Sequence, residues 1–179
     1  MSTTLQRIAY SPLWLLLHAV ALLPFGALYA LSDALAWVAA SVVRYRRRLV
    51  EANIAAAFPD KTEAERRDIV KRFYRNFTDV FVETIKLLHI SDDEMRRRMV
   101  FEDIEHVERI AKDGRSIGLY CSHFGNWEWI TSITLWVYHA DNVEYSQVYR
   151  PLRNKWFDRF WFNLRKRFHS TSIPKNGVL

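Results

Sequence analysis

Apolar residues dominate the first quarter of the chain. Positions 12–31 form a run of twenty residues without a charged side chain, and a second apolar run at 34–43 follows Asp33. Twenty apolar residues are long enough to cross a bilayer as a helix, but Pro24 interrupts the run. The pattern therefore predicts either a transmembrane helix kinked near Pro24 or two shorter helices that dip into one leaflet. A secretory signal peptide and a buried pair of soluble helices are the alternatives, and membrane attachment is favoured over both.

Helical periodicity continues through the middle of the chain. A helix at 51–59 is expected to stop at its proline, and a capping-box pattern at 62–65 predicts a long helix that reaches about Leu88. Glu83 of this helix is interpreted as a solvated or paired carboxylate, with a place in a site as the alternative. The apolar residues of the helix recur every three or four positions, which indicates one face packed against the core; they are Ile69, Phe73, Phe77, Val80, Phe81, Ile85 and Leu88.

Short apolar runs replace this periodicity in the last third of the chain. The pattern predicts a buried strand at 116–122, a helix at 127–138, a strand at 143–149, a helix at 155–168 and the start of a strand at 171–174. This order predicts an α/β fold with an N-terminal membrane helix or helical hairpin, then helices, then a small mixed sheet flanked by helices. Two or three strands are few for a complete sheet. The pattern therefore also predicts a fold that is incomplete at its C-terminus.

Charge adds a class of partner to this picture. The 179 residues carry a net charge of +6, which indicates an anionic partner. Basic residues gather at 44–48, directly after the apolar region, and again at 150–175. Because this positive charge adjoins apolar surface, a membrane is favoured over a nucleic acid duplex, and no nucleic-acid partner is expected.

Several chemistries lack their usual sequence motifs. The chain has neither a phosphate-binding G-x-x-x-x-G-K-[ST] loop nor a G-x-S-x-G elbow. No spacing of histidines and cysteines predicts a zinc site, so neither a metal nor a cofactor is expected. The single cysteine, Cys121, is predicted to be a small hydrophobic residue inside the 116–122 strand, with a thiol nucleophile beside His123 as the alternative.

The strongest candidate for chemistry is the corner where the 116–122 strand is expected to meet the 127–138 helix. His123 would end the strand, and Glu128 would lie in the first helical turn. Sites in open α/β sheets form at such strand-to-helix corners. A carboxylate that accepts a hydrogen bond from one imidazole nitrogen leaves the other nitrogen free to take a proton from a hydroxyl. We therefore expect His123 to act as a general base that Glu128 orients, with a purely structural histidine as the alternative.

Particular stretches of the sequence carry a family resemblance. The most specific are His-Phe-Gly-Asn-Trp-Glu at 123–128 and Tyr-Arg-Pro-Leu at 149–152; the apolar N-terminus with its arginines at 44–48, Asn53, Ala-Phe-Pro at 57–59, Tyr74, Glu83, Asn154 and Asp158 add to them. In these features the chain resembles the late acyltransferases of lipid A biosynthesis, the bacterial lauroyl/myristoyl transferase family. The resemblance covers nearly the whole chain but lacks the family's C-terminal part.

The resemblance implies a fold, an activity and a location. The fold would be like that of the glycerolphosphate acyltransferases, with a membrane-anchoring segment at 1–48 and the N-terminal portion of an acyltransferase domain at 49–179. The activity would move a fatty acyl group from an acyl-carrier-protein thioester to a hydroxyl of a lipid A precursor. It would take place at the cytoplasmic face of the inner membrane.

The resemblance also implies roles for individual residues. His123 would remove the proton of the acceptor hydroxyl, and Glu128 would orient the ring. Arg150, beside Tyr149 in the substrate-binding group, would stabilise the oxyanion or bind a lipid A phosphate, with a surface arginine as the alternative. Asn126 would hold the turn or donate to the oxyanion. The basic aromatic helix at 155–168 would lie on the anionic membrane surface or receive the acidic carrier protein.

The rival interpretation is not enzymatic. A membrane-anchored protein could bind anionic lipid or nucleic acid through the same basic aromatic helix at 155–168. Binding to nucleic acid would weaken steeply with ionic strength. Acyl transfer would instead depend first on His123.

Overall fold

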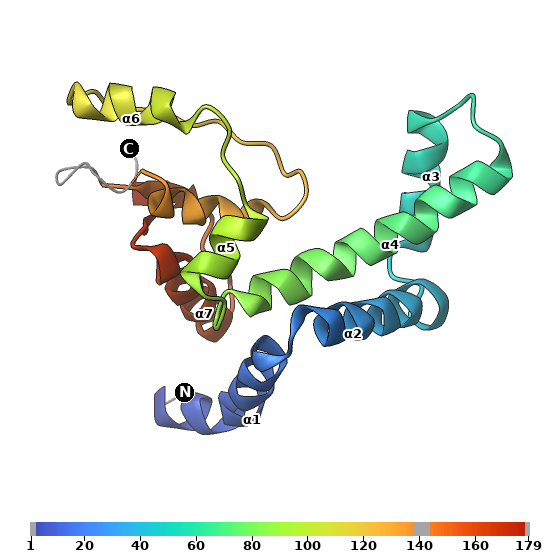
Figure 1. Ribbon diagram of the computed structural model, residues 1–179. Helices are drawn as coiled ribbons and strands as arrows, with labels where there is room; N and C mark the ends of the chain where they lie inside the picture. Colours follow the sequence, from blue (N-terminus) through green and yellow to red (C-terminus); the bar gives the residue numbers. More distant parts are fainter. Residues whose placement is uncertain (1–2, 138–143, 178–179) are drawn as a thin grey trace.

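The computed structural model describes residues 3–137 and 144–177. Most of the described residues are helical (Figure 1), and two strands form a small parallel sheet. The α-helices are α1 (Thr3–Leu22), α2 (Phe25–Trp37), α3 (Arg47–Ala57), α4 (Glu63–Lys86), α5 (Asp92–Arg98), α6 (Ile104–Lys112) and α7 (Lys155–Arg165). The strands are β1 (Ser146–Tyr149) and β2 (Thr171–Pro174), and the other elements are a π-helix, η1 (Val38–Val42), and the 3-10 helices η2 (Trp127–Leu135), η3 (Lys166–Phe168) and η4 (Lys175–Gly177).

The apolar N-terminal region forms two helices that are separated at Pro24. Pro24 has an extended backbone (φ −62°, ψ 152°), because its ring fixes φ and its missing N–H cannot continue the hydrogen bonds of α1. The break confirms the predicted interruption at this proline. The stretch Phe25–Val42 of α2 and η1 is long and apolar enough to cross a membrane, by length and composition alone, and 17% of it is buried.

A buried lysine joins the break between α1 and α2 to α4. The Nζ atom of Lys86 donates hydrogen bonds to the carbonyl oxygens of Ala21 (2.9 Å) and Leu23 (2.7 Å). Carbonyls at the end of a helix have no partner within the helix, so the ammonium group satisfies two of them. Burial lowers the pKa of Lys86.

Helix α4 is the axis of the fold, and α2 and α3 pack along it (Figure 1). Its predicted capping box is confirmed: the Thr62 side chain accepts from the Glu65 amide at 3.3 Å, and the Glu65 carboxylate accepts from the Thr62 amide at 2.8 Å. The helix ends at Lys86, close to the predicted end.

The predicted buried face of α4 is displaced by one residue. Tyr74, Thr78 and Val82 are buried, whereas Phe73 and Phe81 are 40% and 50% exposed. The face of α4 that packs against α2 carries polar residues that form hydrogen bonds, and a pattern of apolar residues cannot predict such a face. The Ser32 hydroxyl of α2 donates to Thr78 Oγ1 at 3.0 Å, and Thr78 Oγ1 lies 3.1 Å from the Ser32 carbonyl oxygen, to which it can donate.

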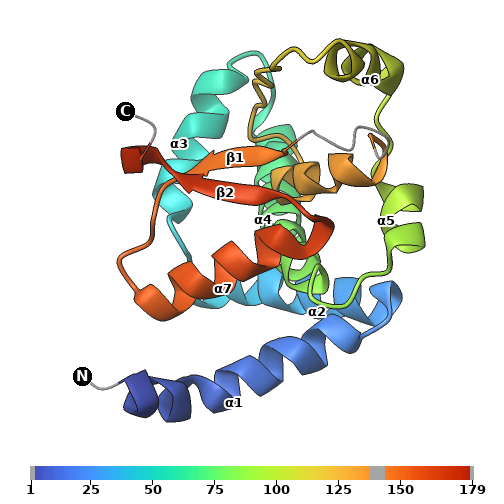
Figure 2. The ribbon, with the colours of Figure 1, turned by 90° about the vertical axis from the view of Figure 1, so that its left-hand side faces the viewer.

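The C-terminal part forms a β–α–β unit. Strands β1 and β2 are parallel, with Ser146 opposite Thr171 and Tyr149 opposite Pro174, and α7 connects them (Figure 2). The helix predicted at 155–168 and the strand at 171–174 are confirmed. The sheet was expected to be mixed, but among the described residues it has two strands, both parallel. A core around Leu87, Ile90, Met95, Trp129, Leu135, Leu164 and Phe168 joins this unit to the end of α4.

The strand predicted at 116–122 is not formed. These residues have no regular secondary structure and are exposed; the exposed fraction of Leu119 is 54%, and Tyr120 is fully exposed. A strand is stable only when its backbone groups pair with a neighbour, and among residues 3–137 and 144–177 β1 and β2 pair only with each other. Cys121 is exposed too, so its predicted burial is wrong. The helix predicted at 127–138 is observed as η2. Its last predicted residue, Tyr138, and the first residue of the predicted 143–149 strand, Val143, lie outside the described residues.

Candidate functional site

His123 lies in an exposed turn rather than at the end of a buried strand. The amide of Phe124 donates to the Ser122 carbonyl at 3.0 Å, and Gly125 takes a left-handed backbone with φ +56°. A residue with a Cβ is disfavoured in that conformation, which explains the glycine in the motif. The imidazole ring lies 4.7 Å from the Trp127 ring, centre to centre. His123 therefore presents its ring to solvent beside one aromatic side chain.

Glu128 is held by an arginine that the sequence analysis did not single out. Its two carboxylate oxygens accept from Arg165 Nε (2.8 Å) and from a terminal guanidinium nitrogen (2.5 Å). The side chains are 13% and 19% exposed, so this fork-like ion pair is mostly shielded from water. Within residues 3–137 and 144–177 no hydrogen bond joins Glu128 to His123. A carboxylate has about four lone-pair positions, so the pairing with Arg165 leaves capacity for a further donor.

Asn126 is tied to α4 and, through it, to α2. Its amide nitrogen donates to Glu83 Oε2 at 3.0 Å, and the Tyr29 hydroxyl donates to the other oxygen, Oε1, at 2.8 Å. The indole nitrogen of Trp129 donates to the Glu83 main-chain carbonyl at 3.2 Å. Glu83 is thus the paired carboxylate that the sequence indicated, and it anchors both ends of the Asn126–Trp129 turn. These bonds favour the turn-holding role for Asn126.

Tyr149 and Arg150 have different surroundings. The Tyr149 ring at the end of β1 lies 6.1 Å from the Phe162 ring, and the Arg165 guanidinium lies 5.9 Å from its centre. Tyr149 and Glu128 therefore approach the same arginine. Arg150 is exposed and, among the described residues, has no hydrogen-bond or ion-pair partner. Its predicted contact with substrate stays a prediction.

Arg165 and Glu83 are the residues of this region that sequence reasoning undervalued. Arg165 was counted only among the basic residues of an amphipathic helix, and nothing in local spacing connects it to Glu128, 37 positions earlier. The sequence feature that could have marked Glu83 as a site residue was its position beside the apolar face of α4. Among the described residues no group of three or more histidine, cysteine or acidic side chains could hold a metal ion.

Comparison with known proteins identifies the family. The model of the family described as bacterial lipid A biosynthesis acyltransferase matches residues 3–179. The chain belongs to this family. A lipid A biosynthesis acyltransferase of Haemophilus influenzae is 24% identical over 143 residues, which is 79% of this chain and 43% of that protein. The lipid A biosynthesis myristoyltransferase of Escherichia coli is 21% identical over 131 residues, 73% of this chain and 39% of that protein.

A third relative gives the same coverage. The lipid A biosynthesis acyltransferase 2 of Shigella flexneri is 23% identical over 125 residues, 70% of this chain and 38% of that protein. The chain thus spans about two-fifths of the length of the curated relatives it matches. No solved structure matches the chain significantly. The resemblance found in the sequence motifs is confirmed at the level of the family.

Proposed function

We propose that the chain carries the His123 corner of an enzyme that transfers a fatty acyl group from an acyl-carrier-protein thioester to a hydroxyl of a lipid A precursor. Family membership supports the reaction class, and the names of the relatives include acyl and myristoyl transfer on lipid A. The observation that carries the proposal is that His123 is exposed on a turn, while two residues that follow it, Asn126 and Glu128, are held by side chains of other helices. Asn126 is bonded to Glu83, and Glu128 is bonded to Arg165.

In the proposed reaction His123 takes the proton of the acceptor hydroxyl while the oxygen attacks the thioester carbon. A carbon–oxygen bond forms, the carbon–sulfur bond breaks, and the proton passes to the leaving thiolate. The oxyanion that forms in between requires a cation or N–H donor. Arg150, which has no partner in the part of the chain that the structure describes, is the candidate for this role. Glu128 is proposed to orient the imidazole with the acceptor capacity that Arg165 leaves free.

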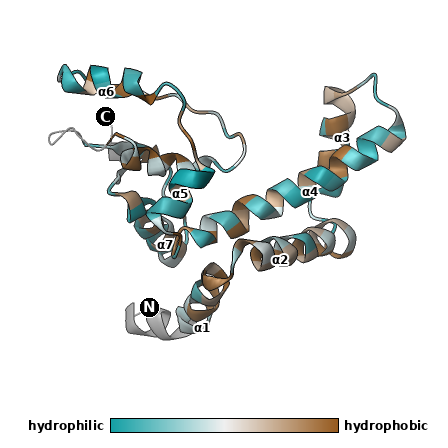
Figure 3. Cartoon of the chain, in the orientation of Figure 1, coloured by the Kyte–Doolittle hydropathy of each residue, from teal (hydrophilic) through white to brown (hydrophobic). Residues whose placement is uncertain are grey.

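We also propose that α1 and α2 lie in the cytoplasmic leaflet of the inner membrane. Exposed apolar side chains occur on both helices and on η1: Trp14, Leu15, Leu16, Leu22, Leu35, Trp37, Val38 and Val42. Figure 3 shows hydrophobic positions along the ribbons of α1 and α2. The polar residues of α2 instead face α4, where Tyr29 bonds Glu83, Ser32 bonds Thr78 and Asp33 pairs with Arg75. A helix with one apolar and one protein-bound face suits the interface better than a full crossing.

The test is transfer by the chain itself. Detergent-solubilised protein is incubated with labelled acyl-carrier-protein thioester and a lipid A precursor, and the acylated lipid is separated and counted. We expect product only when both substrates are present, with free carrier thiol released in equal amount. Absence of product, or thiol release without the lipid acceptor at the same rate, would contradict the proposal. Family membership does not favour the non-catalytic alternative.

A further inference from the structure

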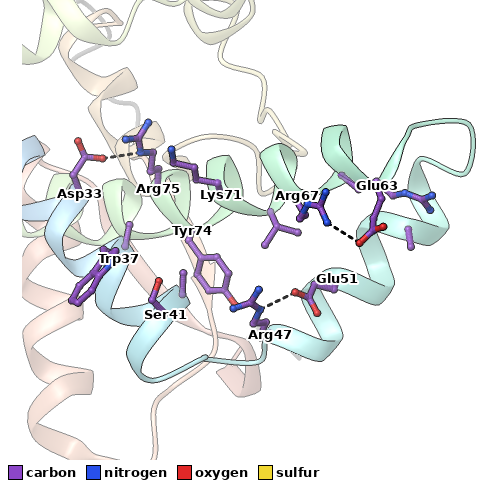
Figure 4. A pocket seen from close by; sticks show the side chains of 15 residues that line it. Asp33, Trp37, Ser41, Arg47, Glu51, Glu63, Arg67, Lys71, Tyr74 and Arg75 are labelled. Carbon is purple, nitrogen blue, oxygen red and sulfur yellow. Dashed lines mark hydrogen bonds and ion pairs between the residues drawn. The ribbon is translucent and has the colours of Figure 1, made fainter.

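A hollow lies between α2 with η1 on one side and α4 on the other, with α3 at its end (Figure 4). Its volume is about 900 Å³. Five cationic side chains line it against three anionic ones: Arg47, Arg66, Arg67, Lys71 and Arg75, and Asp33, Glu51 and Glu63. The lining therefore has an excess of positive charge.

Internal ion pairs account for all three anions. Arg47 pairs with Glu51 at 2.8 Å, Arg67 with Glu63 at 2.8 Å, and Arg75 with Asp33 at 3.0 Å. Figure 4 shows these pairs around the rim of the hollow. The excess charge thus resides on the two remaining cations.

The remaining cations, Arg66 and Lys71, have no side-chain partner within the part of the chain that the structure describes. The Nε atom of Arg66 is buried and makes no hydrogen bond. Leaving such a donor unsatisfied is costly, and buried polar groups in native proteins almost always have a partner. A guanidinium and an ammonium on one wall of a hollow suit an anion with several oxygen acceptors, above all a phosphate.

The opposite wall, formed by α2 and η1, is mostly apolar, with Asp33 and Ser41 as its polar members. It includes Ala36, Trp37 and Ala40, and Trp37 is 64% exposed. This wall belongs to the stretch Phe25–Val42, which is apolar enough for a membrane. Tryptophan is enriched where hydrocarbon meets headgroups. A ligand for this site would therefore combine a phosphate with hydrocarbon.

We propose that this hollow binds the phosphate of an anionic membrane lipid, with Arg66 and Lys71 on the phosphate and the Trp37 wall against the glycerol and acyl chains. The site is separate from the proposed acyl-transfer corner, because Lys71 and Glu83 are about 18 Å apart along the axis of α4. The proposal does not rest on acyl transfer. A lipid bound here would hold α2 and α4 at the level of the headgroups of the membrane.

The experiment uses the delipidated chain in non-ionic detergent and three probes: short-chain phosphatidic acid, a diacylglycerol with the same chains, and inorganic phosphate. Binding is measured by calorimetry at constant ionic strength. We expect phosphatidic acid to bind at least tenfold more tightly than either of the others. Diacylglycerol binding as tightly would show that the phosphate is not recognised, and inorganic phosphate binding as tightly would show a site for free phosphate; either result would overturn the proposal.

Variants of α4 locate the binding. Arg66→Gln and Lys71→Gln should each weaken phosphatidic acid binding about tenfold, the usual size of one charged hydrogen bond, whereas Lys71→Arg should retain it. Arg72→Gln is the matched control, because it removes the same charge from the same helix but Arg72 pairs with Asp68 outside the hollow. An equal loss in Arg72→Gln would mean general attraction to the protein surface and would overturn the site. Circular dichroism establishes that each variant is folded.

Discussion

The α2–α4 contact and the segment at 115–126 are built in opposite ways. The helices are joined by buried polar contacts between residues 46 positions apart, such as Ser32 and Thr78. The segment at 115–126 has no regular secondary structure and is mostly exposed, although it carries the candidate base His123. Exposed backbone and few packed contacts are typical of regions that contribute little to global stability. The comparison separates the well-packed helical contact from the exposed segment to which the chemistry is proposed to belong.

The largest expected effect is on chemistry in the exposed region. We expect His123→Ala to lower the rate of acyl transfer by about 10²–10⁴-fold, the usual contribution of a general base, while the unfolding midpoint stays unchanged. Rates are measured with acyl-carrier-protein thioester and lipid A precursor. The matched control is His106→Ala, since His106 is exposed and its ring bonds Arg109 on α6. An equal loss of activity in both variants would remove His123 from the mechanism.

The next effect is on the ion pair that joins η2, directly after the exposed segment, to α7. Arg165→Met leaves the shielded Glu128 carboxylate without its partner, so we expect about 3 kcal/mol less free energy of unfolding. Denaturant unfolding followed by circular dichroism measures this. Adding Glu128→Gln should recover part of the loss, because the second change removes the stranded charge. Arg159→Met, at an exposed position of α7, should change little; a similar loss there would contradict the role assigned to the pair.

A smaller effect is expected inside the helical contact. Thr78→Val keeps the shape of the side chain but removes the acceptor of the Ser32 hydroxyl, so we expect a loss of about 1–2 kcal/mol in the free energy of unfolding. The control is Ser41→Ala, which removes an exposed hydroxyl from η1. If the two variants unfold at the same denaturant concentration, the polar contacts between α2 and α4 do not support the fold.

The smallest effect should come from the segment that was expected to be a buried strand. Leu119→Ser should change the free energy of unfolding by less than about 0.5 kcal/mol, as is usual for exposed positions. The corresponding change in the core, Leu164→Ser, should be severe because Leu164 is 3% exposed. A large destabilisation by Leu119→Ser would show that residues 116–122 are buried in solution and would remove the contrast between the regions.

Local signals in the sequence predicted the parts of the fold that depend on local physics. Pro24 has a fixed φ and no N–H, so it favours a helix end through its own chemistry, although Pro12 lies inside α1. Thr62 with Glu65 satisfies the free amides of a helix start without help from distant residues. The alternation at 116–122 indicates how a strand would face, but it does not show whether a neighbour is present to pair with it. Strand propensity depends strongly on that context.

The residues of the candidate site remain predictions from the motif, and their contacts could not be read from the sequence. His123, Asn126 and Glu128 are close in sequence, so their motif identified the corner. Arg165 reaches Glu128 only because α7 packs beside η2 in the folded chain. The sequence therefore predicted a carboxylate near a histidine, but not which cation the carboxylate would pair with.

Lys86 of α4 fixes the end of α1 next to the break at Pro24. Two hydrogen bonds from its ammonium group hold the carbonyls of Ala21 and Leu23, just before Pro24, so the end of α1 is fixed to α4. Glu83, whose carboxylate accepts a hydrogen bond from Asn126, lies about one helical turn before Lys86. The end of α1 and the Asn126 turn are therefore attached to the same turn of α4, so a variant that removes the Lys86 bonds would also test whether the Asn126 turn depends on α1.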